Sequence, residues 1–181
     1  MSSIIGMMSA CSAVINGGKT IFPHLVKGVV DLNGKYVDDI YEIKESRSVI
    51  KPETSATMRT LLERVVSAGS GKGAGVNGYS IAGKTGTAQK YENGAIAQGK
   101  YISSFLGFSL EKDAPFGVLM IVDEPKGYVY YGSLVAAPLV GDIYRSIFDL
   151  LGVEKSNDID IEGSFDPENI DDYADYVEQL I

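Results

Sequence analysis

Three consecutive stretches of strand-like sequence constrain the fold of this 181-residue chain most strongly. They cover residues 79–89, 101–109 and 116–123. The connections between them, residues 90–100 and 111–114, are short. A parallel return would need a crossover of about a dozen residues or more, usually with a helix in it. The spacing therefore predicts three antiparallel neighbouring strands, with a loop between the first and the second.

A helix and a hairpin are predicted before these strands. Ser3 is a candidate N-cap for a helix that runs to about Ile15 and ends at the Asn-Gly-Gly of residues 16–18. The residues of this helix are small and apolar almost all round, which favours burial. An Asn-Gly pair at positions 33–34 then predicts a hairpin turn, with residues 36–50 paired back.

Two further helices complete the pattern. Apolar residues recur at helical spacing at Met58, Leu61, Leu62, Val65 and Val66. Thr54 or Ser55 is the expected cap of this helix, and Gly69 is expected to end it. A last helix is predicted over residues 136–151, with Gly152 as its stop. Helix, strands and helix around one sheet indicate an α+β fold, an antiparallel sheet flanked by helices.

Composition places the chain among soluble globular domains, with 45% hydrophobic and 22% charged residues. No apolar stretch reaches the roughly 18 residues needed to span a bilayer. The N-terminus has no basic region typical of a signal peptide, so we expect any export signal or anchor to lie outside this sequence. The single cysteine, Cys11, excludes an internal disulfide and is expected to be a buried thiol.

The net charge of -8 is concentrated at the C-terminus. Residues 154–181 contain ten acidic side chains and one basic side chain, Lys155, so the remainder is close to neutral. No basic patch interleaved with aromatic residues is present, which argues against nucleic-acid binding. We therefore predict one domain over residues 1–152, followed by an acidic tail or linker over residues 153–181.

The motif with the most chemical content is Lys84-Thr85-Gly86, followed by Thr87, within the first predicted strand. A peptide can pair with the exposed edge of such a strand, and Gly86 would let it approach closely. Thr85 and Thr87 share one face and can offer hydroxyls to a terminal carboxylate. Lys84 adds positive charge, and the Thr87 N–H is a candidate oxyanion donor. From the triad alone, an ordinary strand with a solvated lysine remains equally possible.

A phosphate-binding loop is an alternative, because residues 78–85 match G-x-x-x-x-G-K-[ST]. Asp123 and Glu124 follow an apolar strand and would be the magnesium site of such an ATPase. A phosphate loop needs a strand before it and a helix after it. Here a glycine-rich stretch precedes it and Gly86 follows Thr85, so this alternative is the weaker one. A non-catalytic module that only binds peptides is the third possibility.

Several other residues that could suggest catalysis or metal binding are expected to have structural roles. Ser109 and Lys112 match Ser-x-x-Lys by letter, but this chemistry needs both on one helix face and the run is predicted to leave a strand into a turn. His24 is the only histidine and has no partner ligand nearby, so no metal site and no cofactor are expected. Tyr130 and Tyr131 are expected to pack near the rim of the site.

The runs around the triad, taken together, resemble the second half of a class B penicillin-binding protein transpeptidase domain. The resemblance covers about residues 3–152. It is carried by residues 13–19, 81–89, 101–108, 122–125 and 130–138, including Tyr-Tyr-Gly-Ser-Leu-Val-Ala-Ala-Pro at the last of these. It implies a serine D,D-transpeptidase that cross-links peptidoglycan stem peptides ending in D-Ala-D-Ala and is acylated by β-lactams.

The resemblance also implies roles for single residues. Lys84, Thr85 and Gly86 match the third motif of the family, and Thr87 matches the residue that gives the oxyanion N–H and a carboxylate contact. The nucleophilic serine, its lysine and the Ser-x-Asn motif of the family lie upstream of Ser3. The chain is therefore expected to be the C-terminal part of a domain whose N-terminal half is missing, with no nucleophile and no activity alone.

Further expectations follow from the same resemblance. The parent enzyme would act on the outer face of the bacterial cell membrane in cell-wall synthesis, anchored by an N-terminal segment absent here, while this chain would be soluble. Three of the five strands of the family's sheet are expected in this chain. An apolar surface would be exposed where the missing half packs, and self-association across it is expected.

Overall fold

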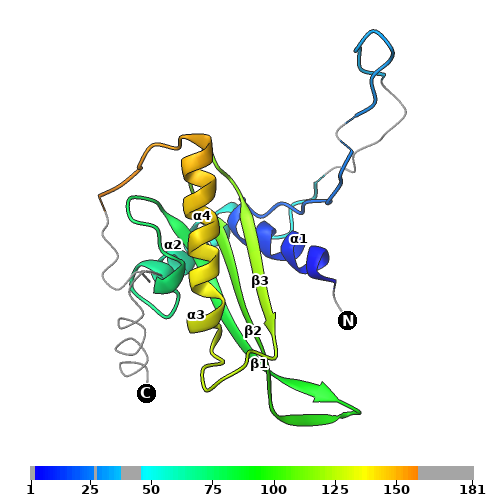
Figure 1. Cartoon of the computed structure of the whole chain (residues 1–181). Coiled ribbons are helices and arrows are strands. Elements are labelled where there is room, and N and C mark those ends of the chain that lie inside the picture. The colour runs from blue at the N-terminus through cyan, green and yellow to red at the C-terminus, as the bar shows by residue number, and fades with distance from the viewer. Residues whose placement is uncertain (1–2, 27, 38–45, 159–181) are drawn as a thin grey trace. The chain divides into compact units, whose positions relative to one another are not determined.

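The computed structural model describes residues 3–26, 28–37 and 46–158, and it divides into two units, Met1–Met58 and Arg59–Ile181. The strands and the α-helices are labelled in Figure 1. In chain order they are α1 (Ile4–Ile15), α2 (Pro52–Ser67), the short 3₁₀ helix η1 (Lys72–Ala74), β1 (Ile81–Glu92), β2 (Ala95–Ser109), β3 (Gly117–Asp123), α3 (Gly132–Val135) and α4 (Ala137–Leu151). The predicted α+β class is confirmed.

The sheet has the order β1-β2-β3, and both pairs of neighbouring strands are antiparallel. The three-stranded antiparallel prediction is therefore confirmed. Phe105 lies opposite Thr85 on one side and opposite Met120 on the other. Among the described residues β1 pairs only with β2, so its other side is a free edge.

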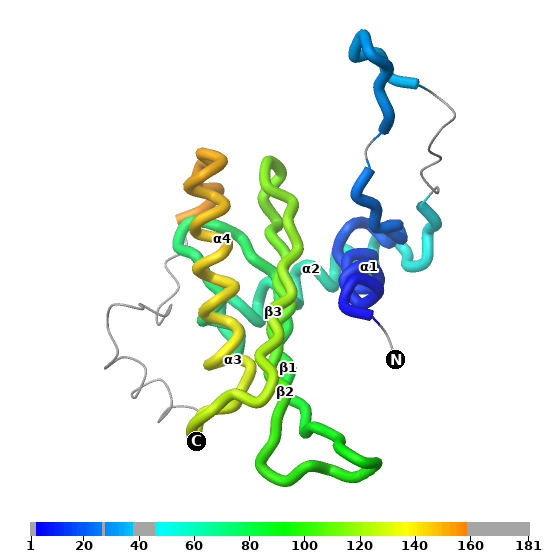
Figure 2. The backbone as a smooth tube through the Cα atoms, turned by 45° about the vertical axis from the view of Figure 1, so that its right-hand side comes forward, coloured from blue at the N-terminus to red at the C-terminus, as the bar shows by residue number. Residues whose placement is uncertain are grey.

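The connection between β1 and β2 is a long hairpin, and the prediction of a loop over residues 90–100 is wrong. Asn93 and Gly94 form the turn, with φ of 52° and 81°. Positive φ at both central residues is the requirement of the type I′ hairpin turn that Asn-Gly favours. The register shifts once, between Gln89 and Tyr91. Figure 2 shows the hairpin (green) extending beyond the end of the sheet.

One face of the sheet is packed against α4. Val140, Tyr144 and Phe148 of α4 are buried in the same core as Ile81 and Phe105 of the strands. Burying one large apolar side chain contributes roughly 1.5–3 kcal/mol, so this cluster is the main source of stability in the unit. The helix ends at Gly152, which adopts a left-handed φ of 63° as the predicted stop.

Glycine makes the close approach of α4 to the sheet possible. A Cβ added at Gly107 would lie 2.9 Å from Val140 and 3.1 Å from Tyr144. The helix therefore rests on bare backbone at this point of β2. A larger residue there would push the helix away from the sheet.

The first unit confirms its predicted N-terminal helix. The Ser3 hydroxyl accepts a hydrogen bond from the Gly6 N–H at 3.1 Å, and α1 ends at Ile15. The apolar character of α1 is not matched by burial, because Ile4 and Ile5 are 59% and 63% exposed. Cys11 is half-buried rather than buried, because it shares this incompletely covered helix.

The hairpin turn of the first unit is confirmed. Val30 bridges to Tyr36, and Gly34 takes a φ of 78°. Part of the predicted return, residues 38–45, lies outside the described residues. A second bridge joins Lys19 to Ser48.

The predicted caps of α2, Thr54 and Ser55, are wrong, because the helix begins at Pro52. Proline is favoured in a first turn, since its missing N–H has no helical partner there and its φ is already helical. The Ser55 hydroxyl is 1% exposed and instead accepts a hydrogen bond from the Gly17 N–H at 2.9 Å. In the described parts of the chain, no helix is long and apolar enough to cross a membrane.

Candidate active site

The Lys-Thr-Gly triad lies in the middle of the edge strand β1. Lys84, Thr85, Gly86 and Thr87 face Leu106, Phe105, Ser104 and Ser103 across the ladder. Because side chains alternate along a strand, Thr85 and Thr87 share the face of Phe105, as the sequence predicts. Strand geometry thus brings two hydroxyls to one face, next to backbone groups of the free edge.

The side chain of Lys84 contacts the next residue, Thr85. Its Nζ donates to the Thr85 carbonyl oxygen at 3.0 Å and lies 3.5 Å from Thr85 Oγ1. Consecutive strand residues point to opposite faces, so the long lysine side chain curls around the strand edge to reach its neighbour. A cationic donor and a hydroxyl therefore meet on an exposed edge, which is a suitable arrangement for binding a carboxylate.

Thr87 is joined to the start of α3. Its Oγ1 accepts a hydrogen bond from the Gly132 N–H at 3.0 Å. A Cβ added at Gly132 would lie 2.3 Å from the Gly86 carbonyl oxygen and 2.4 Å from that of Ser104. Only glycine fits here, because these atoms belong to the backbone and cannot move aside. Sequence reasoning missed Gly132 as a site residue, although the run Tyr-Tyr-Gly that contains it was noted.

Gly86 lies opposite Ser104 of the neighbouring strand. A Cβ at this position would lie 2.5 Å from Ser104 Oγ of the neighbouring strand. This hydroxyl could rotate away, so packing within the sheet does not by itself require glycine at position 86.

Three tyrosines stack beside the entry to α3. The rings of Tyr101 and Tyr130 are 3.9 Å apart between centroids, and those of Tyr130 and Tyr131 are 4.6 Å apart. Hydrogen bonds with the hydroxyls of Tyr131 and Tyr101 raise the pKa of Tyr130 to about 12. The Ser103 hydroxyl donates to the Tyr130 carbonyl oxygen, which ties this segment to β2. The stack holds the α3 entry, and with it the Gly132 N–H, next to β1.

The ATPase alternative is wrong. Lys84 and Thr85 lie inside β1, which is followed by β2. The segment is therefore not a loop that leads into a helix, as phosphate binding would require. Asp123 and Glu124 bind Lys90, whose Nζ lies 2.9 Å from Asp123 Oδ1 and 2.7 Å from Glu124 Oε1. Among the described residues, no group of three or more His, Cys, Asp or Glu side chains is placed to hold a metal.

Ser109 is not a nucleophile paired with Lys112. It ends β2, and its hydroxyl accepts a hydrogen bond from the Glu111 N–H at 3.2 Å. The run continues into a turn rather than a helix, so serine and lysine do not share a helix face. The structural interpretation of this match is confirmed.

The site is thus a Lys-Thr-Gly triad on the open edge of an antiparallel sheet whose face packs against α4. Comparison with known proteins gives the family. The model of the penicillin-binding protein transpeptidase domain matches residues 2–145. The chain therefore belongs to the penicillin-binding protein transpeptidase family.

Individual relatives agree with this assignment. Stage V sporulation protein D of Bacillus subtilis is 40% identical over 150 residues, which are 83% of this chain and 23% of that protein. A probable peptidoglycan D,D-transpeptidase PenA of Neisseria meningitidis is 34% identical over 110 residues, covering 60% of this chain and 19% of its own length. The chain thus spans about a fifth to a quarter of these curated relatives.

Solved structures show the same fold. The transpeptidase domain of penicillin-binding protein 3 from Burkholderia pseudomallei is similar with a TM-score of 0.66 and 26% identity, covering 86% of this chain and 44% of that one. Penicillin-binding protein 3 from Mycobacterium tuberculosis, in complex with aztreonam, is similar in fold with a TM-score of 0.71 and 24% identity, covering 88% of this chain and 38% of that one.

Proposed function

We propose that this chain forms the C-terminal part of a peptidoglycan D,D-transpeptidase, which cross-links stem peptides through a serine acyl-enzyme and is acylated by β-lactams. The observation that carries the proposal is the Lys84–Thr85 pair on the free edge of β1, in a chain of this family. The family's serine, its lysine and its Ser-x-Asn motif would come from sequence upstream of Ser3. This chain alone would then be inactive.

Different groups of β1 would bind different parts of the substrate. A stem peptide would pair with the free edge of β1 through main-chain hydrogen bonds. Lys84 and the Thr85 hydroxyl would bind the terminal carboxylate, and the Thr87 N–H would donate to the oxyanion that forms during acyl transfer. The attacking hydroxyl is not part of this arrangement, so the chain contributes substrate binding and charge stabilisation.

The Thr87 hydroxyl has a more defined role than its position in the sequence suggested. Because Thr87 Oγ1 already accepts from the Gly132 N–H, its own proton is directed elsewhere. The hydroxyl would donate that proton to the substrate carboxylate. Gly132 would in this way set the direction in which Thr87 donates.

The parent protein would act on the outer face of the cell membrane and be held there by a segment outside this chain. We also propose that the transpeptidase domain extends past residue 152. Residues after 158 would then form the acidic tail or linker, because the described residues 153–157 bond back to Gly78 and Tyr79, just before β1.

A chimeric protein tests the proposed function. Residues 3–158 would replace the corresponding segment of stage V sporulation protein D, which would supply the upstream half of the domain. Incubation with a fluorescent penicillin is expected to label the chimera, and labelling should fall by about two orders of magnitude in Lys84→Ala, which removes one charged donor from the site. The 181-residue chain alone is expected to remain unlabelled.

Lys112→Ala is the matched control, because it removes an exposed lysine from the turn after β2. It should label like the unchanged chimera. A folded chimera that is not labelled would contradict the catalytic role and favour a module that only binds peptides. Labelling of the isolated chain would contradict the absence of a nucleophile.

A further inference from the structure

The segment that follows α4 returns to the residues that precede β1. The Tyr79 hydroxyl donates to the Val153 carbonyl oxygen at 2.8 Å. The Gly78 carbonyl oxygen accepts from the N–H groups of Ser156 and Asn157, at 3.0 and 3.3 Å. Asn157 Nδ2 also donates to Ser80 Oγ at 3.0 Å. We call residues 153–157 the C-terminal strap.

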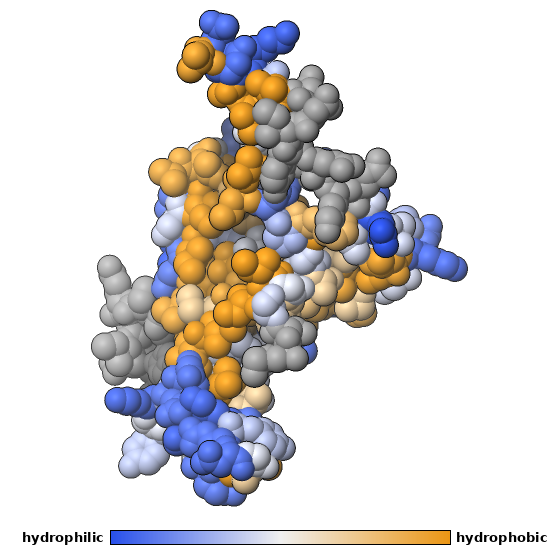
Figure 3. Space-filling model, turned by 90° about the vertical axis from the view of Figure 1, so that its right-hand side faces the viewer, coloured by the Kyte–Doolittle hydropathy of each residue, from blue (hydrophilic) through white to orange (hydrophobic). Residues whose placement is uncertain are grey.

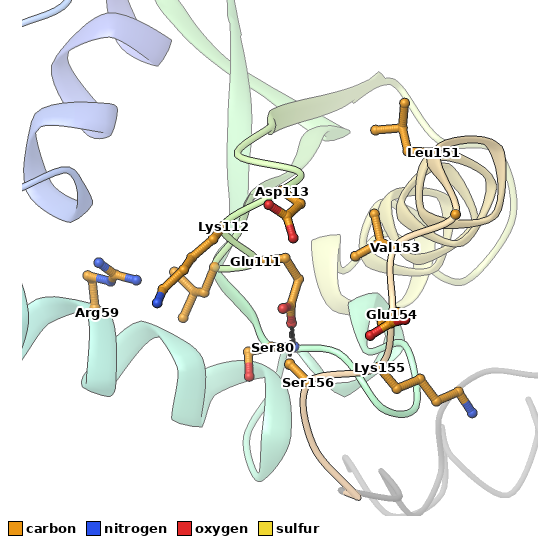
Figure 4. A pocket seen from close by; sticks show the side chains of 12 residues that line it. Arg59, Ser80, Glu111, Lys112, Asp113, Leu151, Val153, Glu154, Lys155 and Ser156 are labelled. Carbon is orange, nitrogen blue, oxygen red and sulfur yellow. Dashed lines mark hydrogen bonds between the residues drawn. The ribbon is translucent and has the colours of Figure 1, made fainter.

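Glu111 joins this strap to the sheet. Its Oε1 accepts hydrogen bonds from the Ser80 N–H and from Ser156 Oγ, both at 2.7 Å. Figure 4 shows the carboxylate between these two residues, in a groove whose walls come from the strap and the turn after β2. Glu111 is 8% exposed, and a carboxylate withdrawn from water in this way needs such donors to replace its hydration.

The position of Ser80 connects this cluster to the active site. Ser80 directly precedes β1, and its backbone is held from both directions. Its N–H binds Glu111, and its carbonyl oxygen accepts from the Leu110 N–H at 2.9 Å. Tyr79, one residue earlier, is stacked on Phe148 of α4 with a centroid distance of 4.3 Å.

An edge strand depends on such anchoring. Among the residues that the structure describes, β1 is paired only with β2, so β2 and the ends of β1 set its register. A slip of one residue would turn Lys84 and Thr85 to the opposite faces of the sheet. Lys84 lies four residues after Ser80, roughly 13 Å along the strand, so an anchor at Ser80 fixes where Lys84 is presented.

We propose that Glu111 is a positioning residue of the transpeptidase site. It holds the first residue before β1 and the C-terminal strap together, and so fixes the register in which the Lys-Thr-Gly triad meets substrate. The catalytic part of this inference rests on the proposed function. The anchoring part concerns only this chain.

The test measures acylation and stability together in the chimera with stage V sporulation protein D. Glu111→Ala is expected to lower the second-order rate of acylation by a fluorescent penicillin at least about tenfold, because small displacements of a binding group are costly. Glu111→Gln keeps an acceptor oxygen and should stay within about threefold of wild type. Asp113→Asn, an exposed acid two residues away, is the matched charge control and should be unchanged.

A general loss of stability is separated from positioning by Val66→Ala. Val66 is 1% exposed in the core, so its truncation lowers the melting temperature while leaving the hydrogen bonds of Glu111 to Ser80 and Ser156 in place. If Glu111 acts by positioning, Glu111→Ala loses acylation, whereas Val66→Ala keeps it even when the two variants have the same melting temperature. Equal acylation in Glu111→Ala and wild type, or equal losses in Glu111→Ala and Val66→Ala, would overturn the proposal.

Amide hydrogen exchange in the 181-residue chain keeps the test independent of catalysis. The Ser80 amide should be protected in wild type and in Glu111→Gln, and should exchange faster in Glu111→Ala. Protection that survives in Glu111→Ala would overturn the anchoring. A wild-type protein that no penicillin labels would refute the proposed function and the catalytic part of this inference, while the exchange result would still decide the anchor.

Discussion

At the scale of single residues, the site depends on glycines that bring backbones together. Gly132 lies against the carbonyl oxygens of Gly86 and Ser104, and its N–H reaches Thr87. Lys84 and Thr85 could be singled out from the sequence because their chemistry belongs to their side chains. Gly132 could not, because its role is the space that a side chain would otherwise occupy.

Gly132→Ala should therefore damage both stability and the site. The added Cβ would meet two carbonyl oxygens at 2.3 and 2.4 Å, so α3 must move away from β1. We expect a loss of about 1–3 kcal/mol in the free energy of unfolding, measured by urea denaturation of this chain. The chimera should also lose most of its labelling by fluorescent penicillin.

Ser133→Ala is the control for this substitution, because it changes the next residue of α3 without adding an atom near β1. It should unfold within about 0.5 kcal/mol of wild type, the range of ordinary substitutions. Wild-type stability of Gly132→Ala would show that α3 does not rest on the strands.

At the scale of elements, the β1–β2 hairpin is secured at its base by ion pairs. Lys90 of β1 binds Asp123 and Glu124 at the end of β3, and Lys100 of β2 binds Glu92 of β1 at 2.8 Å. These pairs are partly exposed, so each contributes little by itself. Together they hold the projecting hairpin to the strand on the far side of the sheet.

The hairpin should loosen in acid. The hydrogen bond from Lys90 lowers the pKa of Glu124 below its ordinary value of 4.5. A carboxylate with a lowered pKa stabilises the fold above that ordinary value, and the contribution is lost as the pH falls through the folded-state pKa. Exchange of the amides in residues 91–100, corrected for intrinsic rates, should therefore accelerate as the pH falls below 4.5 and through the lowered pKa of Glu124.

Glu124→Gln should show the loosened exchange already at neutral pH and little further change in acid. Asp113→Asn, outside the ion pairs, should behave as wild type. An acid response in Glu124→Gln equal to that of wild type would contradict the role of Glu124.

The carboxylates of Glu124 and Asp123 raise the pKa of Lys90, so the same pairs should persist at pH values where an isolated lysine begins to lose its proton.

At the scale of the whole molecule, the chain exposes many large apolar side chains. Figure 3 shows apolar side chains (orange) at the surface. In the first unit, Ile4, Ile5 and Met7 of α1 are 59%, 63% and 39% exposed. Exposed apolar patches of this kind mark surfaces that pack against another protein segment.

The isolated chain should therefore self-associate. Sedimentation velocity is expected to show a concentration-dependent dimer or larger species, driven by burial of the α1 side chains. The double substitution Ile4→Gln and Ile5→Gln should shift the population to monomer. Leu150→Gln, which changes an 84% exposed leucine on α4, is the control and should leave the association unchanged. A monomer at all concentrations in wild type would contradict the prediction.

Much of the fold followed from local signals. The helix after Ser3, the turn at Gly34, the antiparallel strands and the stop at Gly152 each depend on residues close together in sequence. The Asn93-Gly94 hairpin had the same kind of local signal. The residues around it are mostly polar, so they lack the apolar–polar alternation that predicts a strand, and a loop was expected there. The start of α2 was misjudged because Ser55, a good capping residue, is used in a contact with Gly17, which is 38 positions away.

The sequence by itself determined the α+β class, the placement of Lys84, Thr85 and Thr87 on one strand, and the likeness to its family, because these rest on periodicity, turn residues and motif spacing. The tertiary structure alone decided how that strand is held. Gly132 reaches Thr87 across 45 positions, and Asn157 reaches Ser80 across 77. Such contacts form only when packing of α4 on the sheet has brought distant parts of the chain together, so no local sequence pattern predicts them.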